Sequence, residues 1–285
     1  MEKPINQLQK LPPGLLAPVS WFSAPQRGIS RQLLKKYQAN GWLESPARGI
    51  YRRPGPPLKW QHVVASLQHP ELMYLPVIIG GRSALELQGY AHYLRLGGAE
   101  RIHLYAGEKL PKWLNQLGLR DQFVVHTDTL FASPGRGLTS AEMNVAKDEI
   151  VQTDPLRVGM RGGGLREIIW GDWDWTLTHS TVERAMLEVL DDIPRGESFH
   201  QADVLMRGLT TLSPRRLTRL LADCRSIKAK RLFFAFAERH NHPWLTELDE
   251  ASFNLGSGKR ALIPGERLHP KYQITWPRAL DEHGG

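Results

Sequence analysis

The stretch Gly28-Ile-Ser-Arg-Gln-Leu-Leu-Lys-Lys-Tyr-Gln-Ala-Asn-Gly41 carries signals for both ends of one short helix. Ser30 has a side chain that can accept a backbone N–H at a helix start, and Gly41 supplies the left-handed residue that commonly ends one. Two leucines and Tyr37 share one face at helical spacing, while basic and amide side chains occupy the other. The pattern predicts a helix that packs on its apolar face and leaves its cationic face open.

The segments on either side of this helix complete a winged helix-turn-helix. Before it, residues 19–23 have the pattern of a short helix that ends in a turn containing Pro and Gly. After it, residues 42–45 and 50–53 have strand character and flank a tight turn at 46–49. Helix, turn, helix and hairpin in this order predict a winged helix, whose core we place at residues 11–53.

The formal charge of +8 is concentrated at the start of the chain. Residues 1–60 contain ten Lys or Arg and two acidic residues, a difference equal to the charge of the whole 285-residue chain. Residues 61–285 are therefore neutral in sum. A basic module joined to a neutral partner domain is typical of proteins that bind nucleic acid.

The basic winged helix predicts which side chains contact DNA. The start of a recognition helix enters the major groove, where Arg favours guanine and Gln favours adenine. We therefore expect base contacts from Ser30, Arg31 and Gln32. Phosphate contacts are expected from the helix flank and the wing, at Lys35, Lys36, Arg48, Arg52 and Arg53. A winged helix that contacts protein instead of DNA is the alternative.

The chain is long enough for two domains. Pro54-Gly-Pro-Pro57 is the first candidate break, because three of its four residues lack a backbone donor. A predicted helix at 83–88 fits either domain, so the boundary is placed near residue 90. We predict a DNA-binding domain at 1–90 and a larger mixed α/β domain at 91–285, which makes the protein α+β.

The second predicted domain changes character along its length. Short strands are expected at 101–105, 122–126 and 167–170. The sequence Ser180-Thr-Val-Glu183 then matches a capping box and predicts the first of several helices.

A second basic cluster spans Ser213–Arg231. It would extend the DNA surface or bind an acidic protein, unless nearby acids balance its charge. Its candidate contact residues are Arg215, Arg219 and Lys228.

Other motifs give weak indications of chemistry. Asp172 and Asp174, which follow a glycine run that begins at Gly162, resemble the paired carboxylates of a nucleotidyltransferase, but at an unusual spacing. Residues 255–260 match the end of a phosphate-binding loop only superficially, and His240-Asn-His242 lacks further ligands at metal-site spacing. We therefore predict no catalytic residue, no metal site and no cofactor.

The single cysteine, Cys224, excludes an intramolecular disulfide and fits a reducing compartment. The start of the chain lacks the apolar region of a signal peptide, and no apolar run is long enough to span a bilayer. A cytoplasmic location without membrane association is therefore expected.

Several sequence segments resemble those of a known family, the AbiEi-type antitoxins of bacterial type IV toxin–antitoxin systems, which act in abortive-infection phage defence. The matching phrases are Gly28–Lys36, Gly41–Leu43, Arg48–Arg52, Gly80–Gly89, Glu183–Leu187, Cys224–Phe234, His242–Leu245 and Leu255–Arg260. They cover both halves of the chain.

The resemblance implies a winged helix that binds inverted repeats in its own promoter and represses its operon. It also implies a C-terminal domain that neutralises a co-encoded nucleotidyltransferase toxin without a stable complex. The DNA contacts carried over are the residues of the helix and wing named above. Two alternatives stay open: a winged-helix regulator without a toxin partner, and a DNA-targeted nucleotidyltransferase or nuclease.

Overall fold

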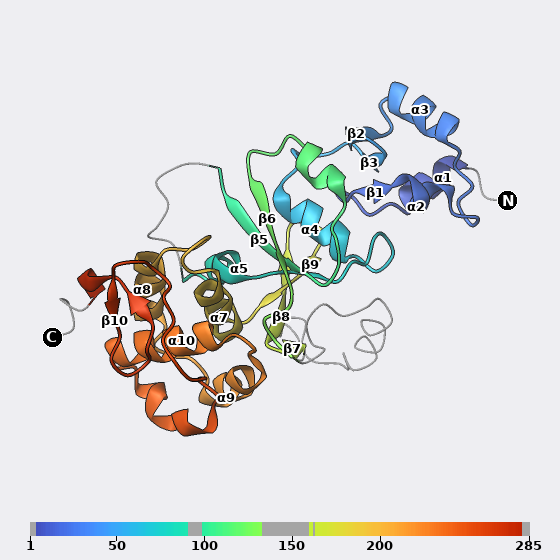
Figure 1. Ribbon diagram of the computed structural model, residues 1–285. Helices are drawn as coiled ribbons and strands as arrows, with labels where there is room; N and C mark the ends of the chain where they lie inside the picture. The colour runs from blue at the N-terminus through green and yellow to red at the C-terminus, as the bar shows by residue number, and fades with distance from the viewer. Residues whose placement is uncertain (1–3, 91–98, 133–159, 162, 281–285) are drawn as a thin grey trace.

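The computed structural model describes residues 4–90, 99–132, 160–161 and 163–280. A small N-terminal unit, a central sheet and a C-terminal group of helices follow one another along the molecule (Figure 1). The first and last segments that the structure describes lie at opposite ends of the molecule. This arrangement of helices and mixed sheets confirms the predicted α+β class.

The N-terminal unit is a winged helix. Its elements are α1 (Pro4–Gln9), β1 (Ala17–Pro18), α2 (Val19–Ser23), α3 (Arg31–Ala39), β2 (Glu44–Ala47) and β3 (Ile50–Arg52). The strands form an antiparallel sheet in the order β1-β3-β2. Helix α3 begins as predicted, because the Ser30 hydroxyl accepts a hydrogen bond from the Leu33 amide at 3.2 Å. Gly41 has the expected positive φ of 72° beyond its end.

The hairpin differs from the prediction at its first strand. Strand β2 begins at Glu44, so Trp42 lies before it with half of its surface exposed. The turn is the pair Arg48–Gly49, and Gly49 has a φ of +78° that suits glycine. Short β1 completes the sheet, although two residues are too few to give a strand pattern in the sequence.

The central sheet has six strands in the order β6-β5-β4-β9-β8-β7. The elements of this part are α4 (Trp60–Gln68), β4 (Val77–Ile79), α5 (Gly81–Leu87), β5 (Arg101–Ala106), η2 (Lys112–Gln116), β6 (Gln122–Thr127), β7 (Met160–Arg161), β8 (Leu165–Trp170) and β9 (Trp175–Ser180). Strand β4 pairs antiparallel with β5 and parallel with β9. The sheet therefore joins residues on both sides of the boundary predicted near residue 90.

Alternation along β5 sends its side chains to two different cores. Ile102 and Leu104 pack with the apolar side of α4 on one face of the sheet. His103 and Tyr105 therefore point to the other face, toward the C-terminal helices. That second face is more polar and carries the contacts described below.

The C-terminal part is built around one buried helix. Its elements are α7 (Val182–Asp192), α8 (Phe199–Gly208), α9 (Pro214–Asp223), α10 (Ile227–Arg239), η3 (Pro243–Glu247), η4 (Glu250–Ser252), β10 (Arg267–Leu268), β11 (Thr275–Trp276) and η5 (Arg278–Leu280). Residues 229–237 of α10 are all buried, and Phe233, Phe234 and Phe236 are fully enclosed. Ser213 caps α9 as predicted by accepting a hydrogen bond from the Arg216 amide.

The capping box expected at the start of α7 is wrong. Thr181 is the N-cap, and its side chain makes no capping hydrogen bond. The Ser180 hydroxyl instead donates to Glu188, farther along α7 than the predicted partner Glu183. Glu183 accepts hydrogen bonds from the Ser213 amide and the Arg216 guanidinium. Long-range partners have displaced the local ones.

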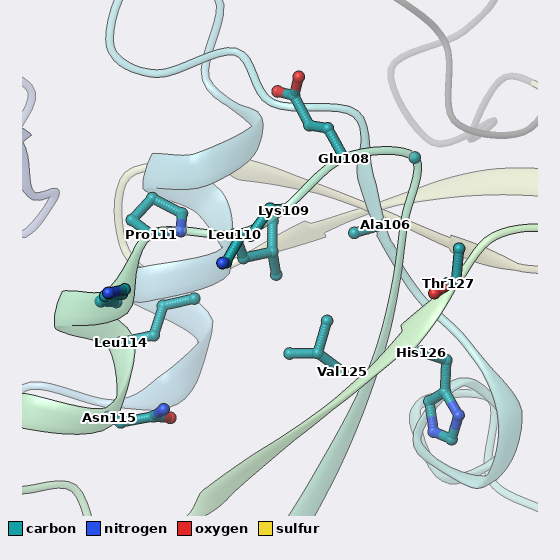
Figure 2. A pocket seen from close by; sticks show the side chains of 12 residues that line it. Ala106, Glu108, Lys109, Leu110, Pro111, Leu114, Asn115, Val125, His126 and Thr127 are labelled. Carbon is teal, nitrogen blue, oxygen red and sulfur yellow. The ribbon is translucent and has the colours of Figure 1, made fainter.

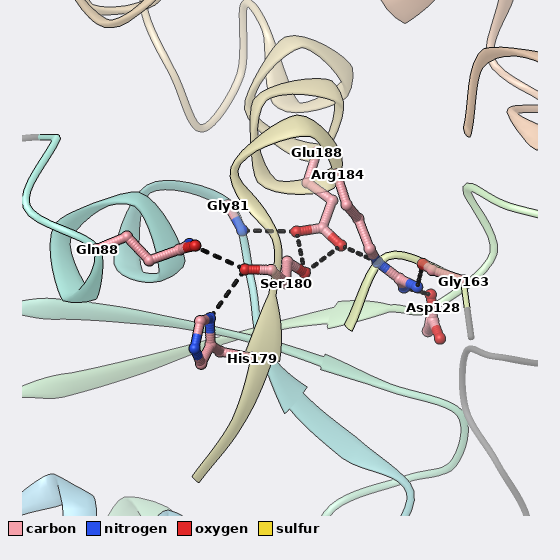
Figure 3. A network of polar contacts seen from close by, with 8 residues as sticks. All are labelled: Gly81, Gln88, Asp128, Gly163, His179, Ser180, Arg184 and Glu188. Carbon is pink, nitrogen blue, oxygen red and sulfur yellow. Dashed lines mark hydrogen bonds and ion pairs between the residues drawn. The ribbon is translucent and has the colours of Figure 1, made fainter. Parts of the chain in front are cut away.

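A buried ionic network fixes α7 against the sheet (Figure 3). The side chain of Arg184 is fully buried and donates to Glu188 at 2.8 Å, to Asp128 at 3.0 Å and to the Gly163 carbonyl at 2.8 Å. Glu188 also accepts the Gly81 amide at 2.7 Å. Three segments that are distant in the sequence therefore meet at one guanidinium, and Glu188 joins a fourth segment to them through Gly81.

We predict that Arg184→Met lowers the free energy of unfolding by about 3–5 kcal/mol, because it leaves the buried carboxylates of Glu188 and Asp128 without their cation. Arg219→Met, at an exposed position of α9, is the matched control and should leave stability unchanged. Urea denaturation monitored by tryptophan fluorescence measures both. Equal stability of the two variants would contradict the central role of this guanidinium.

Candidate nucleic-acid interface

One side of α3 is open and cationic. Arg31, Gln32, Lys35 and Lys36 are exposed, whereas Leu34 and Tyr37 on the opposite side are buried in the core of the winged helix. The helix is nine residues long. Its exposed side therefore presents amide and cationic groups along its whole length.

The start of α3 has a second feature suited to an anion. Ser30 is exposed, and its hydroxyl oxygen already accepts the Leu33 amide. Its hydroxyl hydrogen remains able to donate outward. A helix N-terminus also carries partial positive charge, and the described first turn contains no acidic side chain to oppose it.

The wing supplies fewer cations than expected. Arg48 is exposed at the tip of the two-residue turn, and Arg53 is half-buried just after β3. The Gly49 carbonyl accepts the Val19 amide at 3.0 Å, which holds the turn close to the start of α2. The wing is thus short and rigidly attached.

Arg52, predicted as a phosphate contact, has internal partners. Its side chain is 7% exposed, and its Nε donates to Glu44 at 2.6 Å across the β2–β3 pair. Its Nη1 donates to the Pro56 carbonyl at 3.1 Å. Arg52 therefore connects the wing to the segment that follows it. Two of its guanidinium nitrogens already donate inside the molecule, whereas the Arg48 side chain is exposed.

The charge of the described winged helix is left largely uncompensated. Glu44 is the one acidic residue between residues 4 and 60, and it is paired with Arg52. The exposed cations Arg31, Lys35, Lys36 and Arg48 make no ion pair with any residue that the structure describes. The open face is therefore positive without a neighbouring acid.

The second basic cluster separates into internal and exposed side chains. Arg231 is 4% exposed and donates to the carbonyls of Leu255 and Gly258, so it organises the glycine-containing loop 255–260. Lys228 donates to the Asp191 and Ile193 carbonyls at the end of α7.

Arg215 and Arg219 remain exposed on α9. Arg216 beside them is paired with Glu183 at 2.9 Å. Of the three candidates predicted in this cluster, Lys228 therefore makes internal hydrogen bonds, whereas Arg215 and Arg219 are exposed to solvent.

The remaining motifs have mainly structural surroundings. Asp172 and Asp174 lie in the exposed turn between β8 and β9 rather than side by side on a strand, and Gly162 falls outside the described residues. His240 contacts Asp203 at 2.8 Å, and His242 contacts the Met206 carbonyl at 2.7 Å. Both histidines thus hold α8 against the end of α10.

Cys224 is buried, and burial raises the pKa of its thiol to about 11. A thiol with so high a pKa is protonated at neutral pH and is a poor nucleophile. Its position therefore agrees with a packing role.

One exposed aromatic residue near α3 was not among the predicted contacts. Trp42 follows the helix end, and its side chain is 51% exposed. The sequence predicts a strand over residues 42–45, in which Trp42 would not be a contact residue. Its position beyond Gly41 adds an apolar group to the edge of the cationic face.

Together the fold and this face define a winged-helix protein of the kind that serves as a transcriptional regulator. A family model for the N-terminal domain of AbiEi antitoxin transcriptional regulators matches residues 1–96, and a model for the AbiEi antitoxin of type IV toxin–antitoxin systems matches residues 173–277. The chain belongs to this family of AbiEi antitoxins. The resemblance seen in the sequence is thereby confirmed.

A solved structure shows how widely the fold is shared. The crystal structure of the RV2827C protein from Mycobacterium tuberculosis matches with a TM-score of 0.51 and 15% sequence identity. The match covers 95% of this chain and 88% of that chain, so the two share a fold over nearly their whole lengths. Curated proteins gave no match. No helix among the described residues is both long and apolar enough to cross a membrane.

Proposed function

We propose that this chain represses its own operon by placing the start of α3 in the major groove of inverted repeats in its promoter. The uncompensated cationic face of α3 carries the proposal. A face of this kind, on a helix whose other side is fixed in a core, is what sequence-specific groove binding requires. Membership of a family of transcriptional regulators supports it further.

The proposal gives each exposed residue a role. Arg31 and Gln32 contact base edges, because they are the first two residues of α3 and are exposed. Ser30 and the helix N-terminus contact a phosphate next to them. The cations placed on phosphates are Lys35, Lys36, Arg48 and Arg53. Arg52 positions the wing through Glu44 and takes no part in the contact itself.

Salt dependence of binding tests this proposal. The purified chain should bind the DNA upstream of its own coding region with log affinity falling against log salt at a slope of about −4, one counterion for each phosphate cation. Lys35→Ala should weaken binding and flatten the slope by about 0.9. Fluorescence anisotropy over a series of salt concentrations measures both quantities.

Lys259→Ala is the matched control, because Lys259 is an exposed lysine in the C-terminal part of the molecule, which lies at the opposite end from the winged helix (Figure 1). It should bind with the slope of the unaltered chain. Equal affinity for upstream and unrelated DNA, or the same slope for both variants, would contradict the proposal.

We also propose that the C-terminal part opposes a co-encoded nucleotidyltransferase toxin, as part of a phage-defence system, without forming a stable complex with it. The family to which the chain belongs supports an antitoxin role. The exposed arginines Arg215 and Arg219 are the candidate surface. The neighbouring cations Arg216, Lys228 and Arg231 are engaged in internal contacts instead.

The double variant Arg215→Ala/Arg219→Ala should lose protection when it is expressed together with the neighbouring toxin gene, with viable counts falling at least about tenfold. Its DNA affinity should not change, because α9 lies far from the winged helix (Figure 1). Arg207→Ala, at an exposed arginine of α8, is the matched control. Full protection by the double variant would remove this surface from the proposal.

A further inference from the structure

Two histidines and a carboxylate meet where the edge of the central sheet contacts the C-terminal helices. His103 on β5 and His126 on β6 lie on neighbouring strands, with His103 Nδ1 3.0 Å from His126 Nε2. Their rings are nearly parallel, 13° apart in plane. Ligand atoms of these two histidines and of Asp192, the last residue of α7, all lie within 4.8 Å of one another.

The spacing of the two imidazoles fits coordination of one ion. Two nitrogen ligands at bond lengths of about 2.0–2.1 Å in tetrahedral geometry lie about 3.3 Å apart. The observed 3.0 Å is close to that value.

The other ring nitrogen of His103, Nε2, has surroundings like those found in metal-bound histidines. Its Nε2 faces Glu197 Oε1 at 3.6 Å, too long for a hydrogen bond, and both side chains are 1% exposed. Neither atom has a hydrogen-bond partner among the described residues. Histidines that bind metals commonly direct their other nitrogen at a carboxylate, which fixes the ring orientation.

The Asp192 carboxylate also has one buried oxygen without a hydrogen-bond partner among the described residues. Its Oδ2 makes no hydrogen bond with any described residue, and a Cβ at Gly196 would overlap it. A hydrogen bond between the two imidazoles would account for the His103–His126 contact alone. It would leave three buried polar atoms in one cluster unsatisfied, on His103, Asp192 and Glu197.

We propose that His103, His126 and Asp192 bind a divalent transition-metal ion, with Zn²⁺ as the expected occupant. Two imidazoles and one carboxylate are a ligand set that zinc accepts. Glu197 is a positioning residue that acts through His103. The ion would connect β5 and β6 to the end of α7, and so join the sheet to the helical part of the molecule.

The site is accessible to an ion from solution. His126 and Asp192 are half-buried rather than enclosed. His126 is also one of the residues around an open pocket of about 540 Å³ beside β6, although its ring points away from Val125 and Leu114, which line the same pocket (Figure 2).

Metal titration of the full chain tests the proposal. After treatment with EDTA and dialysis, the chain should bind one Zn²⁺ in calorimetry, and one Co²⁺ should give visible absorption bands typical of a site with nitrogen ligands. His126→Gln and Asp192→Asn should each weaken Zn²⁺ binding by at least tenfold. Glu197→Gln should weaken it by about 10–100-fold, as expected for a group that orients a ligand.

His200→Gln is the matched control, because His200 is an exposed histidine on α8 outside the cluster. It should bind Zn²⁺ as the unaltered chain does. Saturating Zn²⁺ should raise the melting temperature of the unaltered chain and of His200→Gln by about 5 °C or more, and should leave His126→Gln unchanged.

Absence of a one-to-one complex with the unaltered chain would overturn the proposal, whatever the variants do. Equal Zn²⁺ affinity of His126→Gln and His200→Gln would overturn it too. Loss of folding in a ligand variant would appear in its circular dichroism, and the Co²⁺ spectrum of the unaltered chain then decides the question.

Discussion

The fully buried guanidinium of Arg184 is the interaction on which the rest of the structure depends. A charge that is removed from water must be paired. The partners of Arg184 are Glu188 on α7 itself, Asp128 just after β6 and the Gly163 carbonyl just before β8. Helix α7 cannot slide or rotate on the sheet without leaving a buried charge unpaired. That constraint sets the position of the C-terminal helices, and with it the junction where His103, His126 and Asp192 meet.

The cations of the chain are divided between internal and external tasks. Arg52, Arg184 and Arg231 each satisfy carboxylates or carbonyls within the molecule. Arg31, Lys35 and Arg48 are left in solvent without an acidic neighbour. The number of cations therefore does not by itself identify the interface. The interface is identified by those cations that have no internal partner. This distinction makes the face of α3 the strongest candidate for binding DNA.

Features with local causes were predictable from the sequence. Helix α3 has its cap, its apolar face and its terminal glycine within fourteen residues, and all three were confirmed. The same holds for the Ser213 cap of α9. Long-range pairing was beyond reach, because the sheet brings β4 between β5 and β9, and no local pattern encodes that order.

The internal position of Arg52 also depends on pairing between strands. Ile50 and Arg52 share a face of β3, and Glu44 lies directly opposite Arg52 in the register of the hairpin. The ion pair between Glu44 and Arg52 follows from this register. The register itself depends on placing the turn at Arg48–Gly49, which the sequence pattern did not do. The failed capping box shows the reverse case, in which Ser180 and Glu183 match a local motif while distant partners claim both side chains.

Base preference measured by selection from random DNA tests the central claim, that the start of α3 reads the major groove. Gln32→Ala should relax the preference at one or two base pairs of each half-site and keep the rest of the selected sequence. Arg53→Ala should weaken binding uniformly and select the same sequence as the unaltered chain. An unchanged preference in Gln32→Ala and Arg31→Ala alike would show that this helix does not read the bases.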